Sequence, residues 1–215
     1  MIARLGNGLR HLRQHGIVAT LRRIRPHLYS SRKFVIIRKR LRDSVVSGHL
    51  GEIVFRRASA ADLDRLDSLD AHGRGSAQRA FVEQRHDLLF VACHADRIIA
   101  TRRCSREIRD PLVARVVRLG AGQIWVADVF CLPEYRNQAV VRHLILFADR
   151  ELASEHYSEA LAAVDADNIP SLRTSLRSGS EAACYVSSLR MLSYERMRLH
   201  TELPERLQAR LRSTG

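Results

Sequence analysis

The sequence of 215 residues contains four cysteines, and none of them belongs to a C-x-x-C or cysteine–histidine arrangement. A structural zinc site therefore has little support, and the ten histidines are scattered without the companions that a metal site requires. We predict no metal centre and four reduced thiols. Two of the thiols fall inside apolar strand patterns, where cysteine behaves as a small hydrophobic residue. The four are Cys93, Cys104, Cys131 and Cys184.

Long apolar runs are also missing. No segment approaches the roughly 18 consecutive apolar residues that a membrane-spanning helix needs. The apolar clusters near the start are interrupted by arginine, which does not fit the apolar core of a secretory signal. These absences favour a cytoplasmic protein.

Acidic residues are nearly absent from the first 50 positions. Residues 1–50 contain twelve Lys or Arg residues and one acidic residue, Asp43. They therefore carry +11 of the net charge of +13, and residues 51–215 carry +2. Apolar residues recur at helical spacing in 2–15 and 17–28, which predicts two short amphipathic helices. Residues 33–41 form a β-prone run followed by basic residues, and we interpret them as an edge strand or docking arm.

This basic extension has two interpretations. Basic amphipathic helices bind anionic membrane surfaces, and nucleic acid attracts the same charge, so a peripheral membrane location is one expectation. Alternatively, the apolar faces pack against the rest of the chain or against a second copy in a homodimer. The sequence leaves both open.

From residue 51 the pattern changes to alternating strands and helices, and we predict a domain over 51–202 followed by a tail over 203–215. Ser59 with Asp62 three residues later predicts a helix start. The turn at residues 94–96 predicts a hairpin. The predicted strands are 52–58, 88–92, 97–106, 123–131, 160–164, 182–189 and 191–200. One predicted helix begins at residue 60, and three others cover 77–86, 140–156 and 169–177.

The most informative stretch is 129–141. It predicts a buried strand, a turn at Pro133, and a loop that leads into a long helix. The free N–H groups and the dipole at a helix start attract phosphate. A cofactor that carries phosphate is therefore the first hypothesis.

A second segment follows at a matching distance. The apolar run 160–164 predicts a buried strand, and Asn168 opens the helix that contains Ser171. Asn168 fits an N-cap, with a cofactor contact as the alternative interpretation.

In their order and spacing the two segments resemble motifs A and B of the GCN5-related N-acetyltransferases (GNAT). Motif A there reads V-x-P-x-x-R-x-x-G-x-G/A, and this sequence keeps Pro133 and Arg136 but has Ala139 and Val141 at the two glycines. In motif B, Ser175 replaces a tyrosine and Ser180 replaces an aromatic residue, so both motifs are degenerate. The resemblance implies an α/β (α+β) fold with a mixed, mostly antiparallel central sheet flanked by helices.

The resemblance also implies acetyl-CoA as the acyl donor. Backbone groups of one strand would pair with its pantetheine arm, and the loop before the long helix would hold its pyrophosphate. The strand residues are Val129, Phe130 and Cys131, and the loop residues are Arg136, Asn137, Gln138, Ala139, Val140 and Val141. Asn168 is the remaining candidate for a cofactor contact.

Acyl transfer to an amine requires a base for the amine and an acid for the leaving thiolate. Asp128 interrupts an apolar strand, where an ionised group is costly unless it faces a cleft or a partner, so it is either the base or a structural carboxylate. With Ser175 at the position of the family's tyrosine, Tyr185 or Tyr194 is the candidate acid, and both also fit core positions. We predict an N-acyltransferase that uses direct attack by an unidentified amine; the alternative is a non-catalytic module of the same fold.

Overall fold

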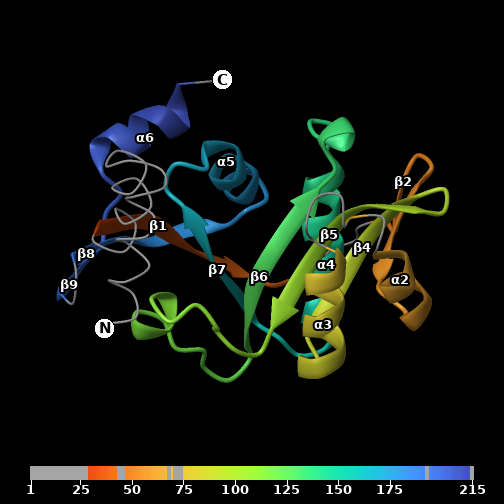
Figure 1. Cartoon of the computed structure of the whole chain (residues 1–215). Helices are drawn as coiled ribbons and strands as arrows, with labels where there is room; N and C mark the ends of the chain where they lie inside the picture. The colour runs from red at the N-terminus through yellow and green to blue at the C-terminus, as the bar shows by residue number, and fades with distance from the viewer. Residues whose placement is uncertain (1–28, 43–46, 67–68, 70–74, 192–193, 214–215) are drawn as a thin grey trace, which may run out of the picture.

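The computed structural model describes residues 29–42, 47–66, 69, 75–191 and 194–213 (Figure 1). The two helices expected over 2–15 and 17–28 lie outside these residues. The elements form one nine-stranded sheet in the order β2-β3-β4-β5-β6-β7-β1-β8-β9. All neighbouring strands are antiparallel except β6 and β7, which confirms the predicted mixed, mostly antiparallel sheet. The strands are β1 (Tyr29–Arg40), β2 (His49–Leu50), β3 (Ile53–Arg57), β4 (Leu88–His94), β5 (Arg97–Ser105), β6 (Gln123–Cys131), β7 (Glu159–Asp165), β8 (Glu181–Met191) and β9 (Tyr194–His200).

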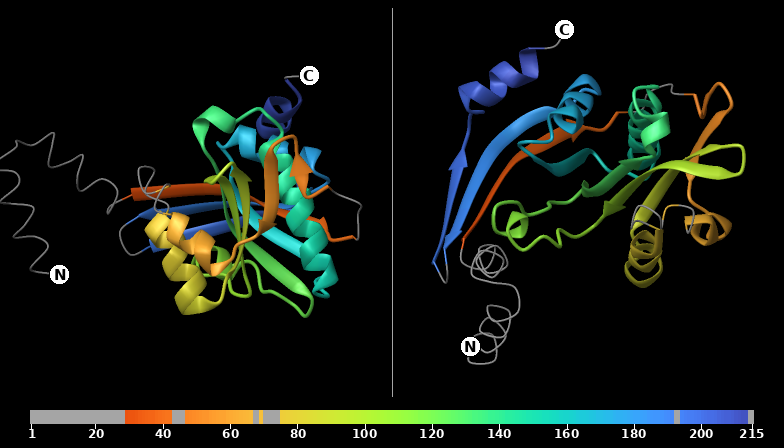
Figure 2. Two further views of the ribbon diagram at one scale, coloured as in Figure 1. Left: turned by 90° about the vertical axis from the view of Figure 1, so that its right-hand side faces the viewer. Right: turned by 45° about the horizontal axis from the view of Figure 1, so that its top comes forward.

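Helices cover both faces of the sheet (Figures 1 and 2). Adjacent strand residues point to opposite faces, and on β5 Thr101 contacts α3 while Arg102 contacts α4, so these two helices lie on opposite sides. Helix α5 packs beside α4, and α6 packs against α5. None of the described helices is long and apolar enough to cross a membrane. The helices are α2 (Ala60–Arg65), α3 (Gly75–Arg85), α4 (Val140–Ser154), α5 (Ile169–Arg177) and α6 (Glu205–Arg212), with the 3₁₀ turns η2 (Val113–Arg115) and η3 (Pro133–Tyr135).

Strand β1 is an interior strand. It pairs with β7 on one side and with β8 on the other. Val35 and Ile37 face a core cluster under α5 and α6, whereas Phe34 and Ile36 face a second cluster with Trp125. An unbroken apolar run is what a strand covered on both faces requires. The interpretation of residues 33–41 as an edge strand or docking arm is therefore wrong, and residues 29–40 belong to the sheet rather than to an extension.

Most of the other elements follow the sequence pattern. Strand β6 and helix α5 have their predicted bounds, and the hairpin of β4 and β5 turns at Ala95, where φ is +50°. Residues 205–212 of the predicted tail form α6, which buries Leu207 in the core.

Asp62 joins the start of α2 to β3. Its carboxylate accepts hydrogen bonds from the backbone N–H of Ser59 at 2.9 Å and from the Arg56 guanidinium at 2.6 Å, and Asp62 is 1% exposed. Burial on its own would raise the pKa of Asp62, but the bonds from Arg56 and Ser59 outweigh it and lower the pKa from 3.8 to about 2. The ionised form therefore stabilises the fold.

Replacing Asp62 with asparagine should lower the free energy of unfolding at pH 7 by about 2 kcal/mol, the equivalent of this pKa shift. Because the pKa is depressed on folding, the contribution is present above pH 3.8 and is lost as the pH falls through about 2. Urea denaturation at several pH values measures it. Asp64→Asn, at an exposed position of the same helix, is the control and should have no such effect; equal losses in the two variants would contradict the assignment.

Candidate functional site between the splayed strands

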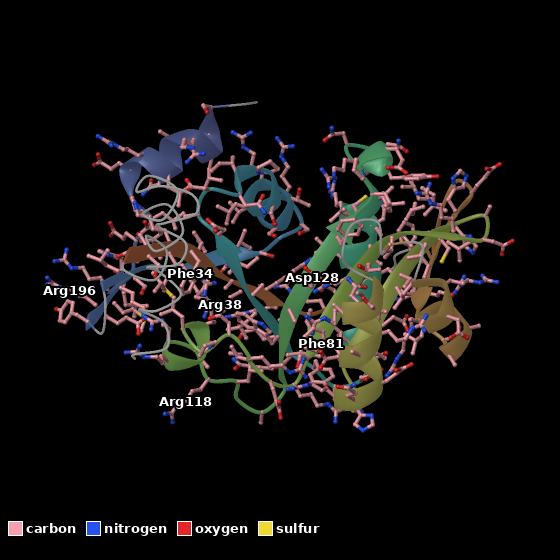
Figure 3. All side chains as sticks on the ribbon, in the orientation of Figure 1. Phe34, Arg38, Phe81, Arg118, Asp128 and Arg196 are labelled. Carbon is pink, nitrogen blue, oxygen red and sulfur yellow. The ribbon has the colours of Figure 1, made fainter. Side chains whose placement is uncertain are left out.

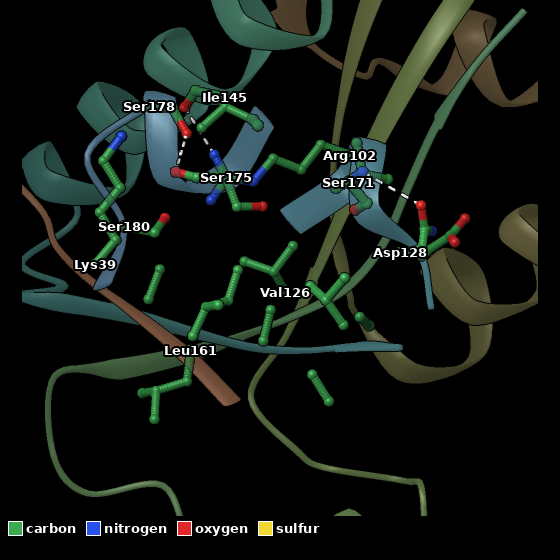
Figure 4. A pocket seen from close by; sticks show the side chains of 18 of the residues that line it. Lys39, Arg102, Val126, Asp128, Ile145, Leu161, Ser171, Ser175, Ser178 and Ser180 are labelled. Atoms are coloured by element: carbon green, nitrogen blue, oxygen red, sulfur yellow. Dashed lines mark hydrogen bonds between the residues drawn. The ribbon is translucent and has the colours of Figure 1, made fainter. Parts of the chain in front are cut away.

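The candidate site is a cavity of about 250 Å³ between β6 and β7 (Figure 4). These parallel strands pair only through three residues each, ending at Trp125 and Leu161. Beyond that point they diverge, and the cavity is lined by residues 126–129 of β6 and 160–165 of β7, together with side chains from α4 and α5. Divergence leaves the backbone of both strands able to pair with an inserted ligand.

A β-bulge on β6 lies beside the cavity. Arg103 of β5 is in register with Asp128, whereas the next residue, Cys104, is in register with Val126, so Ala127 is an extra residue on β6. A bulge bends its strand and redirects the following side chains. The three predicted strand contacts follow it: Val129 is 38% exposed and lines the cavity, Phe130 is half-buried and Cys131 is buried.

The loop from η3 to α4 has the backbone shape that the missing glycines would favour. Ala139, the residue before α4, has φ +58°, and Asn137 has φ +64°. Residues 136–139 are exposed. Arg136 Nε donates to the carbonyl oxygen of Cys131 at 3.2 Å, and the Gln138 amide donates to that of Glu134 at 2.8 Å. The side chains thus hold the loop, and the first N–H groups of α4 lack intrahelical partners, as at any helix start.

The second glycine position behaves differently. Val140 is the first residue of α4 and is buried, and Val141 follows it inside the helix, half-buried against the main core cluster. A helical residue needs no positive φ. Only Ala139 therefore carries backbone strain from the loss of the motif glycines.

Asp128 lines the cavity from β6 (Figures 3 and 4). The side-chain amide of Gln78, which is 3% exposed on α3, donates to Asp128 Oδ2 at 3.1 Å and to Thr101 Oγ1 at 2.9 Å. Asp128 is thus held by an amide from the face opposite to α4. It belongs to the cavity and has a positioning partner, as a base would require.

The two tyrosine candidates do not reach the cavity lining. Tyr185 is on β8, separated from β7 by β1, and it is 8% exposed in a core cluster with Val35. Burial, followed by the negative charge of Asp167, raises the pKa of Tyr185. Tyr194 lies on the edge strand β9 and is 60% exposed.

Asn168 and Ser175 both line the cavity from the α5 side. Asn168 caps the helix, since its Oδ1 accepts a hydrogen bond from the Ser171 N–H at 3.2 Å. This confirms the predicted N-cap and still leaves the Asn168 side chain at the cavity wall. Ser175 places a small hydroxyl where the motif has a tyrosine.

The sequence did not single out the charged residues beneath α4. Lys39 and Arg102 line the cavity, and both bind Asp149 of α4. A signal existed, because Arg102 and Asp149 interrupt apolar patterns in the same way that Asp128 does. Lys39 lies in the basic run 38–40, which the sequence pattern assigns to an edge strand or docking arm.

The cysteines do not form disulfides within the described residues. All four are free. Burial raises the pKa of Cys131 and of Cys104 to about 11, so both thiols are neutral. Within the described ranges, no group of three or more His, Cys, Asp or Glu side chains has the arrangement to hold a metal ion.

The sequence model of the acetyltransferase (GNAT) family matches residues 58–179, more than half of the chain. The chain belongs to the GNAT family. No curated protein matches it. Similar solved structures include a GCN5-related N-acetyltransferase from Sphaerobacter thermophilus, with 16% identity and a TM-score of 0.55, covering 83% of this chain and 57% of that one. A GCN5-related N-acetyltransferase from Kribbella flavida has 14% identity and a TM-score of 0.53, covering 88% of this chain and 65% of that one. An acetyltransferase of the GNAT family from Colwellia psychrerythraea has 11% identity and a TM-score of 0.52, covering 81% of this chain and 57% of that one.

These structural likenesses show the fold. The chain spans less than two thirds of the length of these neighbours. GNAT enzymes use acetyl-CoA, so the family agrees with the donor implied by motif A. The matched region contains β6, the loop and α4, where the motif lies.

Proposed function

We propose that this protein is an acyl-CoA-dependent N-acyltransferase, with acetyl-CoA as the default donor and an amine as the acceptor. The observation that carries the proposal is the divergence of β6 and β7 beyond Trp125 and Leu161. It opens a cavity beside a bulged strand. The same strand continues beyond the cavity lining into a loop with left-handed backbone at a helix start.

The residues present fit this group. The backbone of Val129, Phe130 and Cys131 would pair with the pantetheine arm. The N–H groups of residues 137–141 would hold the pyrophosphate, helped by the charge of the exposed Arg136 and Arg142. Asn168 would add an amide at the cavity wall.

Asp128 would act on the acceptor. When bound, the donor supplies a thioester carbonyl carbon, at which a neutral amine forms the new C–N bond while the C–S bond breaks. Asp128 would take the proton from the amine, directly or through water, and Gln78 would fix the orientation of its carboxylate. Because no tyrosine lines the cavity among the described residues, the leaving thiolate would receive its proton from water, either directly or relayed through the Ser175 hydroxyl, which water reprotonates.

One observation favours a second function. Ala139 and Val141 replace the glycines, and Ser175 replaces the tyrosine, as in a non-catalytic module that has kept the fold. Calorimetry with coenzyme A, followed by an acyl-transfer assay with acetyl-CoA and a panel of amines, separates the two functions. The proposal expects binding and transfer; no binding at millimolar coenzyme A would remove its basis.

Replacing Ala139 with glycine should tighten coenzyme A binding about fivefold, or about 1 kcal/mol. Glycine adopts φ +58° without the strain that alanine carries, and it allows a phosphate to approach the backbone more closely. Isothermal titration calorimetry measures the change. Ala95→Gly is the matched control, because Ala95 also has positive φ but lies in the β4–β5 turn. An unchanged affinity in Ala139→Gly, or an equal change in the control, would mean that the phosphate loop is misplaced.

A further inference from the structure

Two buried cations share one carboxylate at the cavity. Lys39 Nζ lies 2.6 Å from Asp149 Oδ2, and Arg102 Nη1 lies 2.7 Å from Asp149 Oδ1 and donates to the carbonyl oxygen of Ile145 at 2.7 Å. The side chains of Lys39, Arg102 and Asp149 are 12%, 3% and 6% exposed. Two positive charges and one negative charge leave this buried triad with a net charge of +1.

A net charge in the protein interior raises the free energy of the folded state unless an opposite charge compensates it. The other carboxylates among the described cavity residues are Asp128 and Asp165, which lie on the diverged parts of β6 and β7. Arg102 Nε is buried and has no hydrogen-bond partner within the described part of the chain. The triad can therefore accept an anion.

Lys39 lies at the closed end of the cavity. Arg102, whose backbone is in register with Val129 on the diverged part of β6, joins Lys39 through their shared carboxylate on Asp149. Lys39 of β1 is in register with Ala160 of β7, which in turn is in register with Ile124 in the paired part of β6. In Figure 4 the Arg102 side chain extends toward Ile145 and Ser175, away from Asp128. Ser178 and Ser180 add hydroxyl groups to the lining on this side.

The surroundings increase the positive potential at this end. A second cavity, of about 340 Å³, shares Lys39 and Ser178 with the first. Among the described residues, its lining adds Arg38, Arg40 and Arg42 and one further carboxylate, Glu181, which pairs with Arg38 at 3.5 Å. A low-dielectric wall with an excess of cations attracts negative ligand groups.

The course of the strands indicates which part of a ligand reaches the triad. Strand β6 runs from the closed end toward the open end and continues into the loop at residues 136–139. A donor whose phosphates lie at that loop would extend its acyl end toward the closed end, where Lys39 lies beside the carboxylate that it shares with Arg102.

We propose that the acyl group of the donor ends in a carboxylate, as in the coenzyme A thioester of a short dicarboxylic acid, and that Lys39 and Arg102 bind this carboxylate. This inference rests on the proposed function and names its donor class. A carboxylate would compensate the net charge of the triad and accept a hydrogen bond from the Ser180 hydroxyl. A neutral acyl group would not compensate the charge and would offer no carboxylate oxygen to the hydroxyl.

Calorimetry on the full chain tests the inference with matched pairs of thioesters: succinyl-CoA against butyryl-CoA, and malonyl-CoA against propionyl-CoA. Each pair has the same number of acyl carbons, and free coenzyme A measures the shared part of the affinity. We expect at least one dicarboxylic member to bind about tenfold or more tightly than its neutral counterpart, since bonds to charged groups are the stronger class. Lys39→Met should bring this ratio close to one.

Lys33→Met is the matched control, because Lys33 is also a lysine of β1, is exposed and lines neither cavity. It should keep the preference. Equal affinities within both pairs, with free coenzyme A still binding, would overturn the inference and leave the proposed function standing. Failure of every thioester and of coenzyme A to bind would overturn both. The comparison on the unmodified protein decides the matter even where Lys39→Met does not fold.

Discussion

Replacing Asp128 with asparagine should reduce kcat for acyl transfer about 10²- to 10⁴-fold, the usual contribution of a general base, while the Kd for coenzyme A stays unchanged. Asparagine has the same shape and can still accept the hydrogen bond from Gln78, but it cannot take a proton from the amine. Steady-state kinetics with the amine identified by the acceptor panel, together with calorimetry, measures the two quantities separately.

Asp165→Asn is the control for this experiment. Asp165 is the other carboxylate in the described cavity lining, it ends β7, and it is exposed. Its replacement should leave kcat nearly unchanged. A structural role for Asp128 has a different signature, in which the Asp128→Asn protein melts at a lower temperature and turnover per folded molecule is preserved. That result would remove Asp128 from the mechanism.

Replacing Asp149 with asparagine should lower the free energy of unfolding by about 3–5 kcal/mol, because Lys39 and Arg102 would be left buried without a counter-charge. Urea denaturation measures the loss. Glu151→Gln is the control: Glu151 pairs with Arg150 on the same helix, but both are about one third exposed, and such pairs contribute about 0–1 kcal/mol.

A second variant tests the cause of the loss. If repulsion between the two cations destabilises Asp149→Asn, adding Lys39→Met should recover part of the lost stability, so the two changes would not be additive. Additive losses would show that Asp149 acts through packing on α4. The uncompensated charge of Lys39 and Arg102 would then not explain the stability lost in Asp149→Asn.

The sequence predicted those helices and strands whose formation depends on residues close together in the chain. The apolar periodicity of 169–177, with Asn168 at its start, predicted α5 because helix spacing and an N-cap depend on residues within a few positions. The hairpin around residues 94–96 and the strand 123–131 followed for the same reason. In the site, Asp128 stood out because a carboxylate inside an apolar strand needs a cavity or a partner.

The position of β1 could not be predicted in this way. Its neighbours β7 and β8 are more than 100 residues away in the sequence, and no local signal states which strands will pair. This position also changes how the basic segment must be tested. Removing all of residues 1–50 would also remove the interior strand β1. The membrane and nucleic-acid interpretations of the basic extension are therefore to be tested with a variant that lacks only residues 1–28.

The sequence by itself determined the order of strands and helices over residues 52–200, the degenerate motif before α4 and the cap at Asn168, because each depends on neighbouring residues. Only the tertiary structure decided that Tyr185 lies in a core away from the cavity and that Lys39, Arg102 and Asp149 meet beneath α4. Those three residues come from β1, β5 and α4. Their charges act on one another across a few ångströms of protein interior, and such proximity is created by folding and not by spacing along the chain.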